Sequence, residues 1–176
     1  MVGGVFHPRP HPGGPRAVYL RTLCFVFHGR RLLLIRQRSH GTVWWNALGG
    51  KIERGEDPLE AAQREVWEEA GLRPALQFRG VATALVASAG AHWTIFLFSG
   101  RVDRDHVAPS PEGALRWAGA RDLRTLRVFP DLPLLLPPLR RPGGVVLAKF
   151  TYATADPRSF ARAAARVTVF DRAVAP

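Results

Sequence analysis

Three glutamates in the middle of the chain stand at a spacing that brings their side chains together. Glu65, Glu68 and Glu69 are spaced i, i+3 and i+4, and at about 100° per residue these positions share one side of an α-helix. Carboxylates crowded in this way repel one another. A hard divalent cation such as Mg²⁺ resolves the repulsion, because it takes oxygen ligands and completes its shell with water and phosphate oxygens. The spacing therefore indicates a metal site that handles phosphates; the alternative is a solvated acidic face with Arg64 as its ion-pair partner.

The flanking residues predict the helix that positions these glutamates. Asp57 is a good N-cap, Pro58 suits the first helical position, and Glu60 completes a capping box. Gly71 supplies the C-terminal stop, which leaves room for about four helical turns. Apolar residues at helical spacing predict the buried stripe of this helix, namely Leu59, Ala62, Val66 and Ala70.

The glutamates belong to a longer pattern, GKIERGEDPLEAAQREVWEEAGL, which runs from Gly50 to Leu72. It resembles the Nudix box, G-x5-E-x7-R-E-U-x-E-E-x-G-U with U aliphatic, and every fixed position is filled. The resemblance implies a Mg²⁺-dependent hydrolase, with Mn²⁺ as a substitute, that cuts a pyrophosphate bond in a nucleoside diphosphate linked to another group. It further implies that Glu65, Glu68 and Glu69 hold the metal and that Arg64 orients or neutralises a neighbouring glutamate. Structural roles are implied for Gly50, Glu56 and Gly71.

Outside the box, the chain is similar to the MutT-type branch and, within it, to the oxidised-purine (8-oxo-dGTP) nucleoside triphosphate diphosphatases. In W-N-A-L-G-G, Asn46 matches an asparagine that reaches the base, and Gly49 matches a glycine whose carbonyl binds metal. Glu112, five residues before Trp117, matches a loop glutamate that completes the metal site. The alternatives are that Asn46 satisfies local backbone in a turn and that Glu112 is a solvated loop residue.

Two further segments carry the same resemblance. Phe129-Pro130-Asp131 matches an aromatic residue, a proline and the first of two acids that contact the purine, while Leu132 stands in place of the second acid. A carboxylate accepts hydrogen bonds from purine N–H groups, although an Asp after Pro also caps a short helix well. Thr22 matches a position that lines the base pocket and Arg36 a basic position near the substrate; core packing and surface charge are the alternatives.

The resemblance also implies a mechanism. A nucleoside triphosphate lies with its polyphosphate over the box helix, and Lys51, Arg36 and Arg38 help to hold the phosphates. Water attacks a phosphorus in line and releases a nucleoside monophosphate and pyrophosphate, with Glu65 as the general base and Glu68 as the second candidate. The same box also suits an ordinary (d)NTP, a dinucleoside polyphosphate, ADP-ribose or an RNA 5′ end. A non-catalytic nucleotide sensor would be expected to lose box carboxylates, and none is missing.

Composition is that of a single-domain globular protein. The 176 residues suffice for one sizeable core, and 47% of them are hydrophobic. A formal charge of +11, nearly all from arginine, attracts anionic partners, but no nucleic-acid-binding module is evident. The single cysteine, Cys24, has no internal disulfide partner and is expected to pack as a small hydrophobe in a reduced, cytoplasmic protein. No membrane span is expected, and monomer and homodimer both stay open.

The order of predicted elements indicates an α/β sandwich with a mixed sheet, which agrees with the α/β/α Nudix fold that the box implies. Residues 1–17, rich in Pro, Gly, His and Arg, are expected to form a disordered tail, which leaves 18–176 as one domain. Strands are expected at 18–27, 31–36, 81–87, 93–98, 115–118, 145–153 and 167–170, with a short strand and loop at 48–53. Besides the box helix, helices are expected at 131–136 and 157–165.

Overall fold

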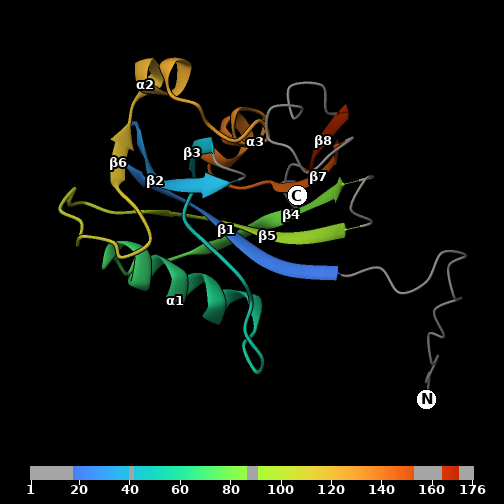
Figure 1. The fold of residues 1–176 in the computed structure, drawn as a ribbon, viewed down its shortest axis with the longest axis horizontal. Helices are drawn as coiled ribbons and strands as arrows, with labels where there is room; N and C mark the ends of the chain where they lie inside the picture. Colours follow the sequence, from blue (N-terminus) through green and yellow to red (C-terminus); the bar gives the residue numbers. More distant parts are fainter. Residues whose placement is uncertain (1–17, 40–41, 87–90, 153–163, 171–176) are drawn as a thin grey trace, which may run out of the picture.

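One mixed β-sheet organises the chain, with helices on both of its faces (Figure 1). The computed structural model describes residues 18–39, 42–86, 91–152 and 164–170. The predicted tail (1–17) and most of the predicted helix (157–163) lie outside the described residues. The strands are β1 (Val18–His28), β2 (Arg31–Ser39), β3 (Thr42–Asn46), β4 (Gln77–Val86), β5 (Ala91–Arg101), β6 (Leu115–Ala118), β7 (Val145–Tyr152) and β8 (Ala164–Phe170). The helices are α1 (Pro58–Ala70), α2 (Ala120–Thr125) and α3 (Leu132–Arg140).

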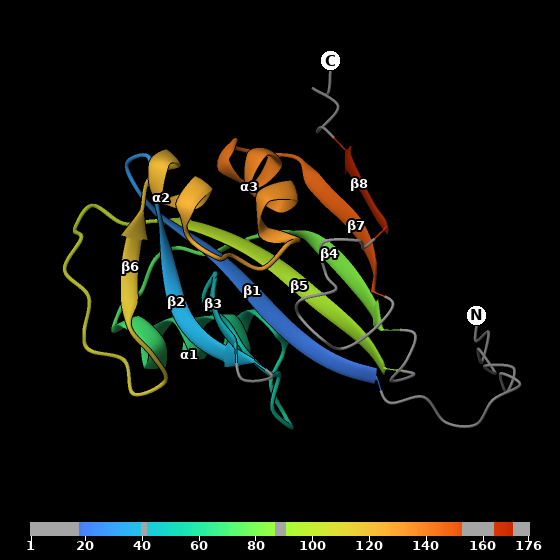
Figure 2. The same ribbon diagram turned by 45° about the horizontal axis from the view of Figure 1, so that its top comes forward.

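The strand order is β3-β2-β1-β5-β4-β7-β8, and β6 pairs with β2 outside this path. The pairs β1–β5 and β4–β7 are parallel, and the other pairs are antiparallel. The two parallel pairs require long crossover connections, which the helices and loops supply. The sheet is therefore mixed and the fold is the α/β/α sandwich that the sequence predicts, as the views in Figures 1 and 2 show.

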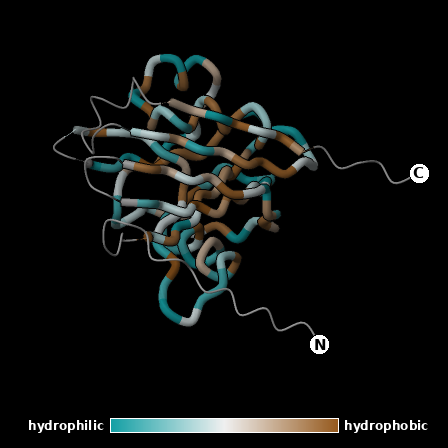
Figure 3. The backbone as a smooth tube through the Cα atoms, turned by 90° about the vertical axis from the view of Figure 1, so that its right-hand side faces the viewer, coloured by the Kyte–Doolittle hydropathy of each residue, from teal (hydrophilic) through white to brown (hydrophobic). Residues whose placement is uncertain are grey.

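Alternation along β1 separates two cores on the two faces of the sheet. Leu23, Phe25 and Phe27 pack with α3, whereas Cys24 and Val26 pack with α1. Figure 3 shows hydrophobic stretches of backbone gathered in the interior of the molecule. Cys24 is fully buried, as predicted for a small hydrophobe.

The predicted caps define α1. The Asp57 carboxylate accepts from the Leu59 and Glu60 amides at 2.7 and 2.9 Å, and the Glu60 carboxylate accepts from the Asp57 amide. Gly71 ends the helix in the left-handed conformation at φ 67°. The prediction for Leu59 is wrong, because this side chain is 39% exposed and Ala61 is buried in its place. Leu59 lies in the first turn of α1, before the helix packs against the sheet.

Several predicted elements differ in detail. The short strand at 48–53 is absent: Leu48 and Lys51 make only isolated bridges to β1, and the true strand, β3, lies just before them. Helix α2 was not predicted from the sequence; the amide of its N-cap residue, Gly119, donates to the Asp122 carboxylate. The predicted helix at 131–136 extends to Arg140 through two prolines. The prediction of a helix at 157–165 is wrong at its C-terminal end, because residues 164–165 belong to β8. Among the described residues no helix is both long and apolar enough to span a bilayer.

Candidate active site

The three box glutamates differ in how deeply α1 buries them. Glu69 is fully buried, Glu65 is 7% exposed, and the Glu68 side chain is 51% exposed. Oε2 of Glu69 accepts from the Gly49 amide at 2.8 Å, whereas Oε1 of Glu69 is buried with no hydrogen-bond partner among the described residues. A buried, unpartnered carboxylate oxygen is costly, so it marks a place where the folded chain lacks a cation or donor.

Two glycines let the loop before the box approach these carboxylates. Gly49 has φ 126°, and a Cβ there would lie 2.5 Å from the Thr22 carbonyl oxygen. A Cβ at Gly50 would collide with the Glu65 carboxylate. The Thr22 and Gly50 backbones pair directly, with the Thr22 amide 2.8 Å from the Gly50 carbonyl oxygen. Only glycine permits this approach, and it places backbone polar groups beside the acidic face of α1.

Arg64 holds the helix and the loop together. Its Nε and Nη2 donate to the two oxygens of Glu56 at 2.6 and 3.0 Å, and Nη2 also donates to the Lys51 carbonyl at 3.0 Å. Its Nη1 lies 3.0 Å from both Glu65 and Glu68. The two hydrogen bonds from Arg64 to Glu56 lower the pKa of Glu56 to about 2. Arg64 thus neutralises part of the acidic face from one side.

The remaining negative charge is not fully compensated. Burial and, to a smaller extent, the charges of Glu65, Glu112 and Glu68 together raise the pKa of Glu69 to about 8, and the Gly49 amide only partly offsets this rise. Burial also raises the pKa of Glu65 against the opposing effect of Arg64. These carboxylates are therefore held in positions that disfavour their charged forms until a cation arrives.

The residues of this site fit a hard divalent cation. They supply an orphaned carboxylate oxygen, two further carboxylates and close backbone groups, all oxygen donors of the kind such ions prefer. In the part of the chain that the structure describes, no three His, Cys, Asp or Glu side chains form a ready-made cage. Mg²⁺ does not require one, since it usually keeps several waters and binds through one or two carboxylates plus substrate phosphates.

The other predicted metal and phosphate residues are all exposed. Glu112 is exposed on the loop before β6, and its charge contributes to the raised pKa values of Glu65 and Glu69. Lys51, Arg36 and Arg38 are exposed. The Lys51 ammonium contacts only Glu53, at 3.5 Å, among the described residues, so it can exchange this surface partner for a phosphate at little cost.

A second group of residues lies where β3 meets the segment before α3. The Trp45 amide donates to the Arg127 carbonyl at 2.8 Å, and the Phe129 amide donates to the Trp45 carbonyl at 3.0 Å. The rings of Trp44 and Phe129 lie 5.4 Å apart. This backbone ladder brings the neighbourhoods of Asn46 and Asp131 together, although 85 positions separate them in sequence.

Asn46 and Asp131 occupy different environments within this group. Oδ1 of Asn46 accepts from the Ala47 amide at 2.9 Å, so part of its side chain satisfies local backbone. Asp131 begins α3 without a side-chain cap hydrogen bond, and its Oδ1 is buried without a partner among the described residues. Burial raises the pKa of Asp131 to about 6. Leu132 is fully buried in the core, so only one acid of this segment is available.

The structure places Thr22 and adds Tyr152. The Thr22 hydroxyl faces the box loop, 3.4 Å from the Gly50 amide, on the α1 side of the sheet. Tyr152, which the sequence analysis did not single out, is 6% exposed, and burial and the charge of Asp131 raise its pKa. The alternation of Val146, Ala148, Phe150 and Tyr152 in β7 was the signal that could have identified it.

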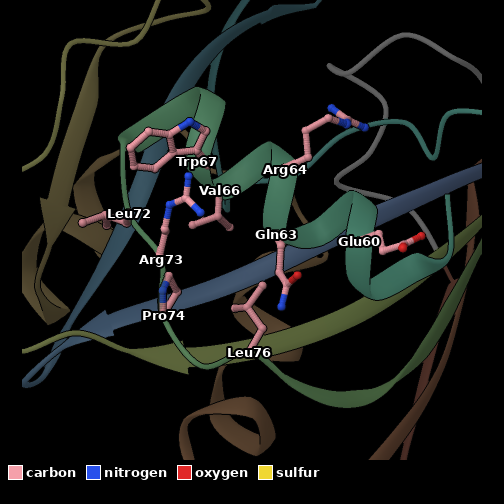
Figure 4. A pocket seen from close by; sticks show the side chains of 9 residues that line it. All are labelled: Glu60, Gln63, Arg64, Val66, Trp67, Leu72, Arg73, Pro74 and Leu76. Carbon is pink, nitrogen blue, oxygen red and sulfur yellow. The ribbon is translucent and has the colours of Figure 1, made fainter.

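A hollow of about 520 Å³ lies along one flank of α1 (Figure 4), and Glu65, Glu68 and Glu69 are not among the residues that line it. The Arg73 guanidinium stacks 4.2 Å from the Trp67 ring there, and Gln63, Leu72 and Leu76 line the rest of the space. Arg64 touches this hollow, but in Figure 4 its side chain points away from Trp67. The hollow is therefore separate from the acidic face.

Comparison with known proteins decides the family. A model of the NUDIX domain matches residues 19–137, more than half of the chain. This chain belongs to the Nudix hydrolase family. The Nudix hydrolase YvcI of Bacillus subtilis is 31% identical over 139 residues, which cover 74% of this chain and 85% of that protein. An oxidized purine nucleoside triphosphate hydrolase of Danio rerio is 46% identical over 54 residues, which are 30% of this Nudix hydrolase and 35% of the fish protein.

Solved structures agree. The MutT protein from Bacillus halodurans superposes on this Nudix hydrolase with a TM-score of 0.69 and 27% identity, over 85% of this chain and 97% of that one. Nudix hydrolases generally use divalent metal ions.

Proposed function

We propose that this Nudix hydrolase is a Mg²⁺-dependent nucleoside triphosphate pyrophosphohydrolase that prefers an oxidised purine such as 8-oxo-dGTP. One observation carries the proposal. Residues 127–129 pair with Trp45, which joins the segment before Asp131 to the segment that contains Asn46. The Asn46 segment continues directly to Gly49, whose amide donates to Glu69 on the acidic face of α1. A base held by Asn46 and Asp131 would direct its phosphates towards the acidic face.

The base preference rests on hydrogen-bond complementarity. Oδ1 of Asp131 is a buried acceptor without a partner among the described residues. Ordinary guanine presents an acceptor at N7, whereas the 8-oxo form carries an N–H there, and a carboxylate can only accept unless it is protonated. A site with a buried acceptor rejects a ligand that leaves it unpaired. The oxidised base is therefore the better match for Asp131.

In the proposed mechanism Glu65, Glu68 and Glu69 would hold a divalent cation, which when bound would neutralise charge on the polyphosphate and acidify water. Glu65 takes the proton of the attacking water, whose oxygen forms a bond to phosphorus as the bond to the bridging oxygen breaks. The electron pair of that bond leaves with pyrophosphate, and a nucleoside monophosphate remains. Glu68 is the second candidate for the base, Glu69 holds the Gly49 loop, and Lys51 and Arg36 hold the phosphates electrostatically.

The test is a hydrolysis panel with Mg²⁺ at mildly alkaline pH. It compares kcat/KM for 8-oxo-dGTP, 2-oxo-dATP, the ordinary (d)NTPs, ADP-ribose and a diadenosine polyphosphate. We expect an oxidised purine to lead, and Asp131→Ala to raise KM and blur the base preference with little change in kcat. Unchanged base selectivity in this variant would restrict Asp131 to starting α3.

A second candidate substrate is an RNA 5′ end, which the formal charge of +11 favours. Curated relatives include an RNA pyrophosphohydrolase of Roseobacter denitrificans, 43% identical over 51 residues, or 29% of this chain and 28% of that protein. A 5′-triphosphorylated RNA therefore belongs in the panel. Faster turnover of this RNA than of any mononucleotide would keep the box chemistry and replace the proposed substrate.

A further inference from the structure

Four arginines from separate parts of the chain surround one hollow of about 330 Å³. Arg79 comes from β4, Arg101 from the end of β5, Arg140 from the end of α3, and Arg141 follows α3 directly. The ladder between β4 and β5 shifts register between residues 78 and 80, which is where Arg79 stands. Such a bulge turns a side chain out of its regular alternation, and here it sends Arg79 towards the end of α3.

Arg79 forms the inner wall of this arginine hollow. It is 3% exposed, and all of its N–H groups have acceptors. These acceptors are the Ser99 hydroxyl and the carbonyls of Pro138, Leu139, Gly143 and Gly144. Every one of them is neutral, so the guanidinium is well hydrogen-bonded while its charge stays uncompensated. Burial accordingly lowers its pKa.

Arg101 and Arg140 stand around the ring of Phe27. Their guanidinium carbons lie 5.6 and 5.9 Å from the ring centre. Arg101 donates to the Gly29 and Arg140 carbonyls at 3.4 and 3.3 Å, long contacts to neutral oxygens. Nε of Arg140 is buried with no hydrogen-bond partner among the described residues. The walls therefore hold N–H donors that are weakly used or unused.

No acidic side chain balances these arginines. The lining of the hollow contains no aspartate or glutamate, and none of the four forms an ion pair within the part of the chain that the structure describes. Elsewhere, Arg31, Arg64 and Arg116 each have a carboxylate partner. Four like charges around one hollow repel one another, and an anion in the hollow would offset that repulsion.

The arginine hollow is distinct from the acidic face of α1. Phe27 and Leu139, which line it, belong to the core between the sheet and α3, whereas the box helix packs on the opposite face. An anion bound there would not reach the carboxylates of the active site from the same side of the sheet. The hollow is also at the small end of ligand pockets, which usually measure about 300 to 1,000 Å³.

We propose that the arginine hollow is a second site that binds a small phosphate-bearing anion, either free pyrophosphate or the phosphate tail of a nucleotide. Planar guanidinium groups match phosphate oxygens in bidentate geometry. Arg101 and Arg141 are exposed at the rim and supply the donors, while Arg79 fixes the wall through its contacts to β5 and α3. The site does not depend on the substrate assigned to the acidic face.

The experiment is isothermal titration of the full chain, at low ionic strength and with EDTA present so that no turnover occurs. Inorganic pyrophosphate and a non-hydrolysable α,β-methylene nucleoside triphosphate are the two probes. We expect saturable binding of at least one probe, weakened about tenfold or more in Arg101→Ala and Arg141→Ala, as for a charge-assisted hydrogen bond that is lost. Equal affinities for the two probes indicate that the site binds free pyrophosphate. Much tighter binding of the nucleotide indicates that the site binds the phosphate tail of a nucleotide, and either result supports the proposed site.

Matched variants keep the test specific. Arg121→Ala removes the same charge from an exposed residue of α2 outside the hollow and should leave binding unchanged. Arg101→Lys keeps the positive charge but loses the planar guanidinium group that binds phosphate oxygens in bidentate geometry. This variant should bind the probes more weakly than the wild type does. Thermal unfolding of each variant checks the fold. Equal losses in Arg121→Ala and Arg101→Ala, or no binding of either probe, would overturn the proposal, as would tight binding of a 12-nucleotide RNA through these arginines in the absence of pyrophosphate binding.

Discussion

The acidic face of α1 and the arginine hollow are two clusters of like charge that the chain assembles in opposite ways. Glu65, Glu68 and Glu69 come from one helix within five residues, and one internal counter-ion, Arg64, lies against two of them. The four arginines come from three separate stretches of sequence, and their acceptors among the described residues are neutral. A cluster of like charges can therefore arise from the spacing of residues along one helix or from the folding together of distant segments.

The buried and exposed members of the two clusters also have different roles. On α1 the buried member, Glu69, and the exposed member, Glu68, both face the ligand region predicted from the box. In the arginine hollow, the buried Arg79 stabilises the fold, and the exposed Arg101 and Arg141 are available to bind a ligand. Removing charges one at a time should therefore affect stability in one cluster and catalysis in the other.

The largest expected effect is on stability, in the hollow. Arg79→Met leaves several buried carbonyls without donors, so the free energy of unfolding should fall by about 3 to 5 kcal/mol. Urea unfolding followed by circular dichroism measures this. A loss below about 1 kcal/mol would mean that water replaces the guanidinium and that the wall does not depend on Arg79.

On the acidic face the effect should fall on catalysis. Glu69→Gln or Glu65→Gln should reduce kcat at least about 100-fold, as expected when a metal ligand or general base is lost. Thermal stability should be kept, because the change removes crowded negative charge and leaves an oxygen that can accept from Gly49.

Glu60→Gln is the matched control for these variants. It removes a charge from the same helix, and the capping box tolerates Gln at this position, so its activity should match the wild type. Near-wild-type turnover by Glu69→Gln would remove the proposed mechanism.

Asp131 offers a lone buried carboxyl for comparison with the crowded ones. Because burial raises its pKa to about 6, its contribution to stability is fully present below the unfolded pKa near 4 and is lost as the pH rises through 6. Asp131→Asn should therefore gain about 2 kcal/mol of stability relative to the wild type between pH 4 and pH 7.5. Parallel stability curves for the two proteins over this range would contradict the assigned pKa shift.

The smallest effect is expected at the rim of the hollow. Arg141→Ala should change the free energy of unfolding by no more than about 0.5 kcal/mol, because the side chain is exposed and makes no ion pair among the described residues. Chemical denaturation beside Arg79→Met checks the contrast between rim and wall. A rim variant as unstable as the wall variant would make the whole cluster structural.

Local patterns explain what the sequence could predict. The cap at Asp57, the stop at Gly71 and the glutamate spacing are short-range signals, and the structure has α1 from Pro58 to Ala70. The family resemblance pointed to the fold class, which these local elements alone left broader.

The features that escaped prediction depend on contacts between distant segments. β3 is a strand because it pairs with β2 and with residues 127–129. The local sequence around Trp44 and Trp45 does not predict these long-range pairings. Arg79 looks like any of the many arginines until a bulge turns it inward. Leu59 has the right spacing for the buried stripe but lies in the first turn, where α1 has not yet reached the sheet.

The position of β1 at the centre of the sheet has a consequence for how the molecule opens. β1 pairs with β2 on one side and, over ten registered residues, with β5 on the other, and its two sides carry Cys24 towards α1 and Phe27 towards the hollow. Backbone amides of β1 should therefore exchange with deuterium only through global unfolding. The two oppositely charged sites then share one cooperative unit, so neither can melt alone while the strand between them stays protected.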